Sequence, residues 1–304
     1  MVQTDELANM AHHQFELSSG RHIGVSILGE PLATRLVLLC LPTACAGPFD
    51  PDPIVTVAAG IKVIEIDRPG YGASDPLPDD IAPTVEQFAD DMAEYLQRVE
   101  IVASDTSGER FGTVAIIGWS FGGIVAAAFA ARHPDLVDRL VLVATPRPEQ
   151  LQHGERYSAI AELRKHGVER TRASLKASLD DDGHPSLLTI GIDGDDPDLA
   201  PLGMRGRVER MIDAGWMQQS SGIASDRLAV RANDWVDAVS AASRETLLVY
   251  GARDDLATSK DADWFEHRLG HSTRVEAVGS GHLVIATEWP RITSFVAADE
   301  KAIP

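Results

Sequence analysis

Cysteine is scarce in this sequence of 304 residues, which has only Cys40 and Cys45. A domain whose fold is stabilised mainly by disulfide bonds would need more cysteines than this. A bridge between the two is conceivable but not favoured, and neither has an adjacent histidine that would activate a thiolate. We expect a small buried residue and a loop residue rather than a redox pair.

Basic residues are also few. Lys and Arg number 27 against 46 Asp and Glu, which gives a formal net charge of −19 at pH 7. Nucleic acids and anionic membranes attract proteins through patches of Lys and Arg, and no such patch is visible. We therefore expect neither a nucleic-acid nor a membrane partner, and we expect a small-molecule substrate whose nature the charge does not reveal.

Long apolar runs are missing. No stretch approaches the roughly 18 residues that a transmembrane helix needs. Residues 1–13 contain acids and histidines, without the basic segment and apolar stretch of a secretory signal. We expect a cytoplasmic protein.

The remaining composition is that of an ordinary globular protein, with 44% hydrophobic and 24% charged residues. The length exceeds one average domain, but single α/β domains often contain an inserted subdomain. Residues 146–237 are polar, charged and interrupted by Gly and Pro, with amphipathic pieces such as 207–217. We expect a core of residues 1–145 and 238–304, and a largely helical cap of residues 146–237.

Apolar patterning predicts the architecture of the core. A two-stranded ribbon is expected around the turn at Ser18–Gly20. A helix is expected from Thr84, where Gln87 completes a capping box. Further helices are expected at 121–132 and 292–298. Apolar runs that indicate buried strands occur at 36–41, 63–66, 114–117, 140–143, 246–250 and 275–278. Strands that alternate with helices in this way predict a mostly parallel sheet.

The sharpest local signal is the sequence Gly118-Trp119-Ser120-Phe121-Gly122, between an apolar strand and an Ala-rich helix. The bare Gly-x-Ser-x-Gly pattern arises by chance in about one chain in ten of this length, but its strand-turn-helix setting removes most such accidents. A nucleophile on this turn needs strained backbone, and small residues at Gly118 and Gly122 would avoid clashes with the flanking strand and helix. The helix N-terminus favours developing negative charge. We expect Ser120 to be the nucleophile.

A serine hydroxyl needs a base, and the base needs a carboxylate that holds its tautomer and stabilises its cation. Asp254 follows the strand at 246–250, and His282 follows the strand at 275–278. Both are expected at the sheet edge where parallel strands end. Asp255 competes with Asp254 for the role of the carboxylate, and Asp226 is an outside candidate.

The chain resembles the capped alpha/beta-hydrolase fold enzymes, which include many esterases, lactonases and carbon-carbon bond hydrolases. The order Ser, Asp, His is theirs. The likeness covers nearly the whole length and includes the segments Gly251–Asp254, Gly279–His282 and Asp67–Asp75. It favours Asp254 over Asp255 and implies a mostly parallel central sheet flanked by helices, with a helical cap insertion. We interpret Asp67–Asp75 as structural, with a tight turn and with Arg68 anchoring neighbouring loops.

One departure from the family concerns the oxyanion hole. Family members usually have a His-Gly pair after the strand that corresponds to 36–41, and the next residue donates its backbone N–H. Here Leu41-Pro42 follows, and proline has no N–H to donate. If Leu41-Pro42 replaces the pair, Thr43 is the donor together with Phe121. The other alignment places Pro42 at the donor position, which would remove a contact worth about two to three powers of ten in rate.

These features predict a serine hydrolase without cofactor. Ser120 would attack an ester-like carbonyl with His282 as base, and water would release the acid from the acyl-enzyme. Carboxylic ester hydrolysis is the expected reaction. Carbon-carbon bond hydrolysis, lactone opening and thioester cleavage use the same machinery, and a non-enzymatic receptor for a small ligand is the alternative of another class. A serine at position 120 argues against the haloalkane dehalogenase and epoxide hydrolase chemistry of resembling enzymes, and the oligomeric state is not indicated.

Three tryptophans are candidates for the walls of a substrate pocket. Trp119 is beside the serine, and Trp216 and Trp235 are in the expected cap, although each could be a buried core residue instead. A helical cap indicates a small or medium organic substrate, because a lid limits access by polymers. We expect no metal, since His12-His13 and the histidines at 267–271 lack a third ligand at useful spacing.

Overall fold

A computed structural model describes residues 11–107, 112–147, 165–229, 239 and 244–298. Within them, the strands form an eight-stranded sheet with the order β1-β2-β4-β3-β5-β6-β7-β8. β1 pairs antiparallel with β2 and β2 with β4, and all other neighbours are parallel. The strands are β1 (Ala11–Glu16), β2 (His22–Gly29), β3 (Arg35–Cys40), β4 (Ile61–Ile66), β5 (Val114–Trp119), β6 (Val137–Val143), β7 (Glu245–Gly251) and β8 (Ser272–Ala277). The predicted mostly parallel α/β architecture is confirmed.

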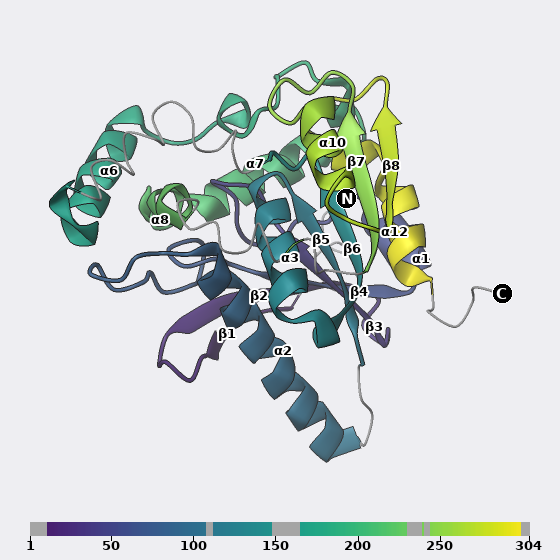
Figure 1. The fold of residues 1–304 in the computed structure, drawn as a ribbon, viewed down its shortest axis with the longest axis horizontal. Helices are drawn as coiled ribbons and strands as arrows, with labels where there is room; N and C mark the ends of the chain where they lie inside the picture. The colour runs from purple at the N-terminus through teal and green to yellow at the C-terminus, as the bar shows by residue number, and fades with distance from the viewer. Residues whose placement is uncertain (1–10, 108–111, 148–164, 230–238, 240–243, 299–304) are drawn as a thin grey trace, which may run out of the picture.

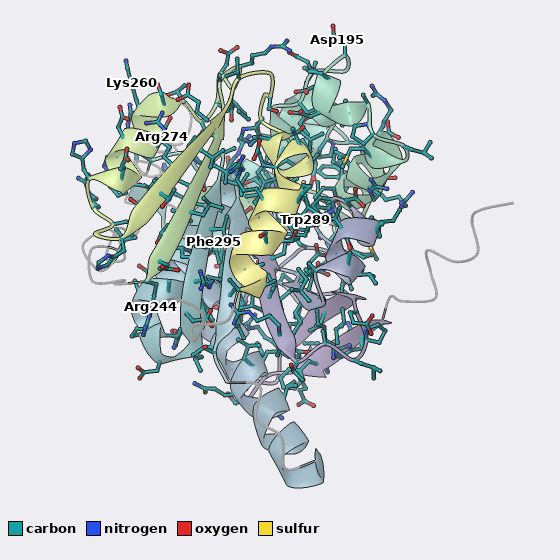
Figure 2. All side chains as sticks on the ribbon, turned by 90° about the vertical axis from the view of Figure 1, so that its right-hand side faces the viewer. Asp195, Arg244, Lys260, Arg274, Trp289 and Phe295 are labelled. Atoms are coloured by element: carbon teal, nitrogen blue, oxygen red, sulfur yellow. The ribbon has the colours of Figure 1, made fainter. Side chains whose placement is uncertain are left out.

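Helices cover both faces of the sheet. In the view of Figure 1, α1 and α12 lie behind it, and α2, α3 and α10 lie in front. These helices are α1 (Pro53–Ala58), α2 (Val85–Ser107), α3 (Phe121–Arg132), α10 (Ser259–Glu266), α11 (Val284–Thr287) and α12 (Trp289–Ala297), with a short 3-10 helix, η1 (Pro134–Leu136). The indole of Trp289, labelled in Figure 2, ties α12 to α1 because its Nε1 donates to Thr56 Oγ1 at 2.9 Å.

The central strand β5 and most of α3 are apolar on all sides. All residues of β5 are buried, and so is every residue of α3 from Phe121 to Ala130. Such continuous burial needs covering layers on both sides, which α2 and the strands supply to α3. The Ser120 turn between β5 and α3 is therefore fixed to the rigid centre of the molecule.

The start of α2 shows half of the predicted capping box. The N–H of Gln87 donates to Thr84 Oγ1 at 3.0 Å. The side-chain amide of Gln87 donates to Asp91 at 2.9 Å instead of reaching back to Thr84. The side chain of Thr84, the residue directly before α2, thus caps one backbone N–H of the first turn that has no partner within the helix.

The described residues 165–229 between β6 and β7, which we call the insertion, contain only helices as regular structure. They are α6 (Val168–Asp182), η2 (Leu187–Ile190), η3 (Pro197–Leu199), α7 (Met204–Gly215) and α8 (Ser221–Ala229). Figure 1 shows α6, α7 and α8 at the end of the sheet toward which the arrows of β7 and β8 point. The precise limits of a core and a cap stay a prediction. None of the described helices is both long and apolar enough to cross a membrane.

Candidate active site

The backbone at Ser120 is strained. Its φ of 56° and ψ of −124° lie outside the regions that non-glycine residues ordinarily occupy. Hydrogen bonds hold this conformation, because the N–H of Ser120 donates to Val143 O and its carbonyl accepts from the N–H of Gly123, both at 2.9 Å. The residue is partly exposed at the N-terminus of α3. The turn thus presents a hydroxyl at the sheet edge where nucleophiles of this kind lie.

Glycines make this turn possible. A Cβ at Gly118 would overlap the backbone of Gly122 and Gly123, and a Cβ at Gly122 would overlap the carbonyl of Cys40. The prediction that both residues must be small is confirmed. Gly123 is equally constrained, by the side chain of Thr145, which the motif alone did not indicate.

His282 and Asp254 meet as a buried pair. The Nδ1 of His282 is 2.8 Å from Oδ2 of Asp254, and the two side chains are each about 1% exposed. The other carboxylate oxygen accepts the N–H groups of Leu256 at 2.8 Å and Ala257 at 3.1 Å. Asp255 is exposed. Of the two adjacent acids, Asp254 is therefore the one placed to orient the imidazole.

The loop of His282 is attached to the nucleophile turn. The indole Nε1 of Trp119 donates to the backbone carbonyl of His282 at 2.9 Å, and the two rings are 6.2 Å apart. Within the described structure, His282 Nε2 is buried and has no hydrogen-bond partner, so Ser120 and His282 are not hydrogen-bonded. Catalytic hydrogen bonds are often long in unliganded enzymes and tighten when substrate binds.

The loop after β3 is held through its carbonyls. Arg68 donates to Leu41 O at 2.7 Å and to Pro42 O at 2.8 Å, so the predicted anchoring role of Arg68 is confirmed. The next residue, Thr43, is half-buried. Among the described residues, neither the N–H of Thr43 nor that of Phe121 is occupied by a hydrogen bond. Both remain our predicted oxyanion donors.

Asp226 lies on α8, where it binds Arg68 with both carboxylate oxygens, and the imidazole of His282 is paired with Asp254 instead. Burial alone lowers the pKa of Arg68, but the Asp226 carboxylate raises it above its ordinary value, so the guanidinium stays charged. This pairing removes Asp226 from the candidates for the triad acid. The sequence contained no local signal for it, because 158 positions separate the partners.

A second buried aspartate, Asp198 in η3, was missed in the sequence. It accepts the hydroxyl of Ser280 at 3.1 Å, the N–H of Gly281 at 3.2 Å and the hydroxyl of Thr287 at 2.5 Å. The first two donors directly precede His282. A carboxylate of the insertion thus fixes the loop that carries the histidine.

The three tryptophans differ in their surroundings. Trp119 is fully buried and stacks on Phe49 with ring centroids 5.6 Å apart. Trp216, at the end of α7, is half-buried and meets the ring of His184 edge-on. Trp235 lies outside the described residues. A pocket role for these side chains stays a prediction.

Both cysteines are free and buried. Burial raises the pKa of the Cys40 thiol to about 12 and raises that of Cys45 as well. Thiols of this kind are protonated and inert at neutral pH. The expectation that neither is a reactive thiolate agrees with these surroundings.

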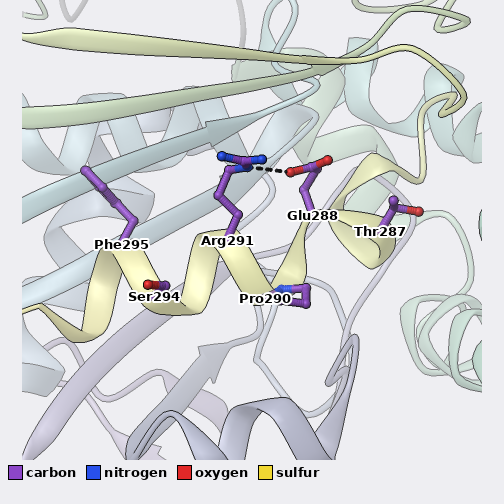
Figure 3. Close-up of a pocket in the computed structure, with 6 residues that line it drawn as sticks. All are labelled: Thr287, Glu288, Pro290, Arg291, Ser294 and Phe295. Carbon is purple, nitrogen blue, oxygen red and sulfur yellow. Dashed lines mark hydrogen bonds and ion pairs between the residues drawn. The ribbon is translucent and has the colours of Figure 1, made fainter.

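A surface hollow of about 690 Å³ lies along α11 and α12. Figure 3 shows its lining side chains, among them Glu288 and Arg291, which form an ion pair at 2.8 Å. None of the lining residues belongs to the predicted site. We therefore do not assign the substrate to this hollow.

Named relatives of the chain include hydrolases and esterases. It is 25% identical to the AB hydrolase superfamily protein YisY of Bacillus subtilis over 240 residues, which are 78% of this chain and 81% of that protein. Identity to the pimeloyl-[acyl-carrier protein] methyl ester esterase of Chromobacterium violaceum is 37% over 101 residues, 31% of this chain. The matched part spans only 32% of that esterase and 16% of the biotin biosynthesis bifunctional protein BioHC of Teredinibacter turnerae.

Solved structures share the fold. The enol-lactonase of Burkholderia xenovorans LB400 superposes with a TM-score of 0.65 at 20% identity, covering 93% of this chain and 98% of that one. The esterase EaEST of Exiguobacterium antarcticum superposes with a TM-score of 0.63 at 18% identity, covering 95% and 100%. At such identities the likeness concerns the fold alone.

The family comparison covers most of the chain. The sequence model of the alpha/beta hydrolase fold matches residues 48–288, which include the Ser120 turn, Asp254 and His282. Among the relatives, the proteins of Chromobacterium violaceum and Neisseria meningitidis are named methyl ester esterases. The chain belongs to the alpha/beta hydrolase fold family.

Proposed function

We propose that the chain is a serine hydrolase that cleaves a carboxylic ester of a small or medium organic substrate. The observation that carries the proposal is the buried pair of His282 and Asp254, whose free ring nitrogen has no partner, beside the strained turn of Ser120. A buried polar nitrogen without a partner is costly, and an imidazole nitrogen that is free to accept a proton suits a general base. The esterase names of several relatives favour an ester over other acyl compounds.

Acylation would use each of these groups in turn. Ser120 Oγ attacks the ester carbonyl carbon while its proton moves to His282 Nε2. Asp254 stabilises the imidazolium through Nδ1, and the N–H groups of Thr43 and Phe121 bind the oxyanion. The tetrahedral intermediate collapses, the C–O bond to the alkoxy group breaks, and His282 returns the proton to the departing alcohol.

Deacylation repeats the steps with water as the nucleophile. His282 Nε2 takes a proton from water, the hydroxide adds to the acyl carbon, and the bond to Ser120 Oγ breaks. Ser120 regains a proton from His282, and the carboxylic acid leaves. The chain's own side chains supply every proton transfer.

The insertion limits the size of the substrate. A Cβ at Gly191, just after η2, would lie 3.3 Å from His282 Cδ2, so insertion backbone covers the imidazole. An active site covered in this way suits a small molecule better than a polymer. A lactone is a cyclic ester that the same steps would open, and a carbon-carbon bond hydrolase would also use the same triad.

Hydrolysis of short p-nitrophenyl esters tests the proposal. We expect Ser120→Ala to lower kcat by at least about three powers of ten. Ser294→Ala, which alters an exposed serine on α12, should keep the native rate. A serine-reactive phosphonate should add its mass to the peptide that contains Ser120. Equal ester turnover in the native chain and Ser120→Ala would refute the nucleophile, and an inert native chain that binds the esters would favour the receptor.

Substitutions at the adjacent Asp254 and Asp255 test which of the two carboxylates orients His282. Asp254→Asn should reduce kcat by about three to four powers of ten, because the amide favours the wrong imidazole tautomer. Asp255→Asn should leave kcat within about twofold, since surface substitutions have small effects. The reverse order of effects would show that the carboxylate was assigned wrongly.

A further inference from the structure

Asp226 joins the insertion to the centre of the molecule. It lies on α8 and is 1% exposed. Its carboxylate accepts from Arg68 Nε at 2.9 Å, from Arg68 Nη2 at 2.8 Å and from the hydroxyl of Tyr71 at 2.8 Å. Arg68 and Tyr71 are also buried. A buried, fully hydrogen-bonded cluster of this kind is costly to break from one side.

Arg68 and Tyr71 also bind the loop after β3, one on each side of Thr43. Arg68 donates to the carbonyls of Leu41 and Pro42, and the hydroxyl oxygen of Tyr71 accepts the N–H of Ala44 at 3.0 Å. Ala44 has a φ of 65°, a strained value for a residue with a side chain. The residue between these contacts is Thr43, whose N–H is left free.

Arg68 also lies beside the other proposed donor. Its guanidinium carbon is 5.2 Å from the centre of the Phe121 ring, within the range of a cation–π contact. One cation therefore touches both parts of the proposed oxyanion hole. The carboxylate that fixes this cation belongs to the insertion.

We propose that Asp226 and Tyr71 are positioning residues through which the insertion sets the geometry of the oxyanion hole. The inference rests on the proposed function. The polar side-chain atoms of both residues are hydrogen-bonded within the cluster, so these side chains are engaged with protein groups instead of substrate. They act by holding Thr43 between Pro42 and Ala44, and the insertion is then part of the catalytic apparatus besides covering it.

Tyr71→Phe separates positioning from folding. The ring of Tyr71 packs against Gly222, where a Cβ would overlap it, and phenylalanine keeps that packing. Only the oxygen is lost, which leaves the N–H of Ala44 without its acceptor and the strained turn less restrained. Asp226→Asn is the second variant, because it keeps the shape and removes the charge that pairs with Arg68.

The matched control is a different buried ion pair. Asp91, on α2, binds Arg21 at 2.6 Å and is 6% exposed. Asp91→Asn removes a charge from a comparable pair without touching the loop after β3. A loss of stability alone should lower the melting temperatures of Asp91→Asn and Asp226→Asn without changing kcat below the transition.

The measurements are kcat, KM and the Ki of an alkylboronic acid, whose tetrahedral adduct places an oxygen where the oxyanion binds. We expect Tyr71→Phe and Asp226→Asn to lower kcat about 10- to 100-fold, part of what complete loss of a donor costs. KM should change by about twofold or less, and Ki should rise by about the factor by which kcat/KM falls.

Native kcat and native Ki in Tyr71→Phe would overturn the inference, and so would an equal loss of kcat in Asp91→Asn. Asp226→Asn is not needed for this decision if it fails to fold, since Tyr71→Phe decides alone. Failure of the proposed function has another signature, namely turnover that survives in Ser120→Ala.

Discussion

Gly122 sets how closely α3 approaches β3. A Cβ at this position would overlap the carbonyl groups of Cys40 and Leu41. Backbone atoms of a central strand cannot rotate away as a flexible side chain can. The contact fixes the distance between the nucleophile turn and the loop of Thr43.

We expect Gly122→Ala to destabilise the protein by about 1–3 kcal/mol, the usual cost of overpacking. It should also lower kcat, because the loop after β3 must move. Thermal unfolding and ester hydrolysis measure the two effects. Gly270→Ala is the matched control, since no atom lies near its Cβ position; a similar loss there would remove the steric explanation.

Asp50 is a buried carboxyl whose charge is unfavourable. It is 8% exposed, and burial raises its pKa to about 6. Its Oδ1 accepts both the hydroxyl of Thr56 at 2.7 Å and the N–H of Asp52 at 3.0 Å. An asparagine can keep these bonds through its own oxygen. The folded state holds the Asp50 proton more tightly than the unfolded chain, so this residue's contribution to stability falls as pH rises from about 4 to 6.

We therefore expect Asp50→Asn to be more stable than the native chain above pH 6, by up to about 3 kcal/mol for a shift of this size. The difference should vanish below about pH 4. Urea unfolding at several pH values measures it. Asp138→Asn should show the opposite sign. Although burial opposes the shift, Arg35 lowers the pKa of Asp138, so its stabilisation is present at neutral pH and lost in acid. Curves that do not depend on pH would contradict both assignments.

Local sequence was most informative where the conformation of a residue depends on its neighbours in the chain. The turn of Ser120 follows from its flanking glycines and its strand-turn-helix setting. The place after a strand indicated Asp254 or Asp255, and only the resemblance to the family favoured Asp254. The roles of Asp226 and Asp198 could not be predicted, because their partners are 158 and about 80 positions away. Nothing in their own sequence distinguishes them from exposed aspartates.

Strands buried on both faces were predicted well, since their apolar runs are short and are bounded by turn-forming or polar residues. β8 begins at Ser272, before the predicted strand, because this edge strand is only partly buried and lacks a continuous apolar run. The closing helix was predicted at 292–298, but α12 begins at Trp289 and contains Pro290 in its first turn. Proline is accepted in the first turn of a helix, where its missing N–H is not needed. The short helices α1 and α10 have too few residues for a clear period.

The 3-10 helix η3 is expected to hold the loop of His282 through Asp198. In Asp198→Asn an NH₂ group replaces one carboxylate oxygen. At least one of the three donors that Asp198 accepts then loses its acceptor. We expect a fall in kcat of about tenfold and a lower melting temperature, measured on the same preparation. Ser280→Ala, which removes one donor but keeps the carboxylate, should be milder; the reverse order would show that Asp198 does not order this loop.

The excess negative charge affects the stability of the whole folded protein. The net charge of −19 implies mutual repulsion in the compact state. Each exposed ion pair is worth only about 0–1 kcal/mol. Added salt screens both the repulsion among the excess carboxylates and the attraction within these pairs, and we expect the loss of repulsion to be the larger effect. The sign of this balance follows from the composition, whereas the position of the insertion relative to the sheet required the folded chain.

We expect the thermal midpoint to rise by a few degrees when NaCl increases from about 20 to 200 mM, where the Debye length falls below 10 Å. Scanning calorimetry measures the shift. KCl at equal ionic strength should act alike, which separates screening from binding of a particular ion. A midpoint that falls with salt would show that attractive pairs dominate.

The burial of α3 from Phe121 to Ala130 has a consequence for how the chain reaches its native state. A helix without a water-facing side gains little by forming alone, since its stability comes from the layers around it. We therefore expect the segment that begins at Phe121 to become stable as β3, β5, β6 and α2, which contact it in the native state, assemble around it. During refolding, catalytic competence should thus appear in the final consolidation of the interior, after most of the helical signal has already returned.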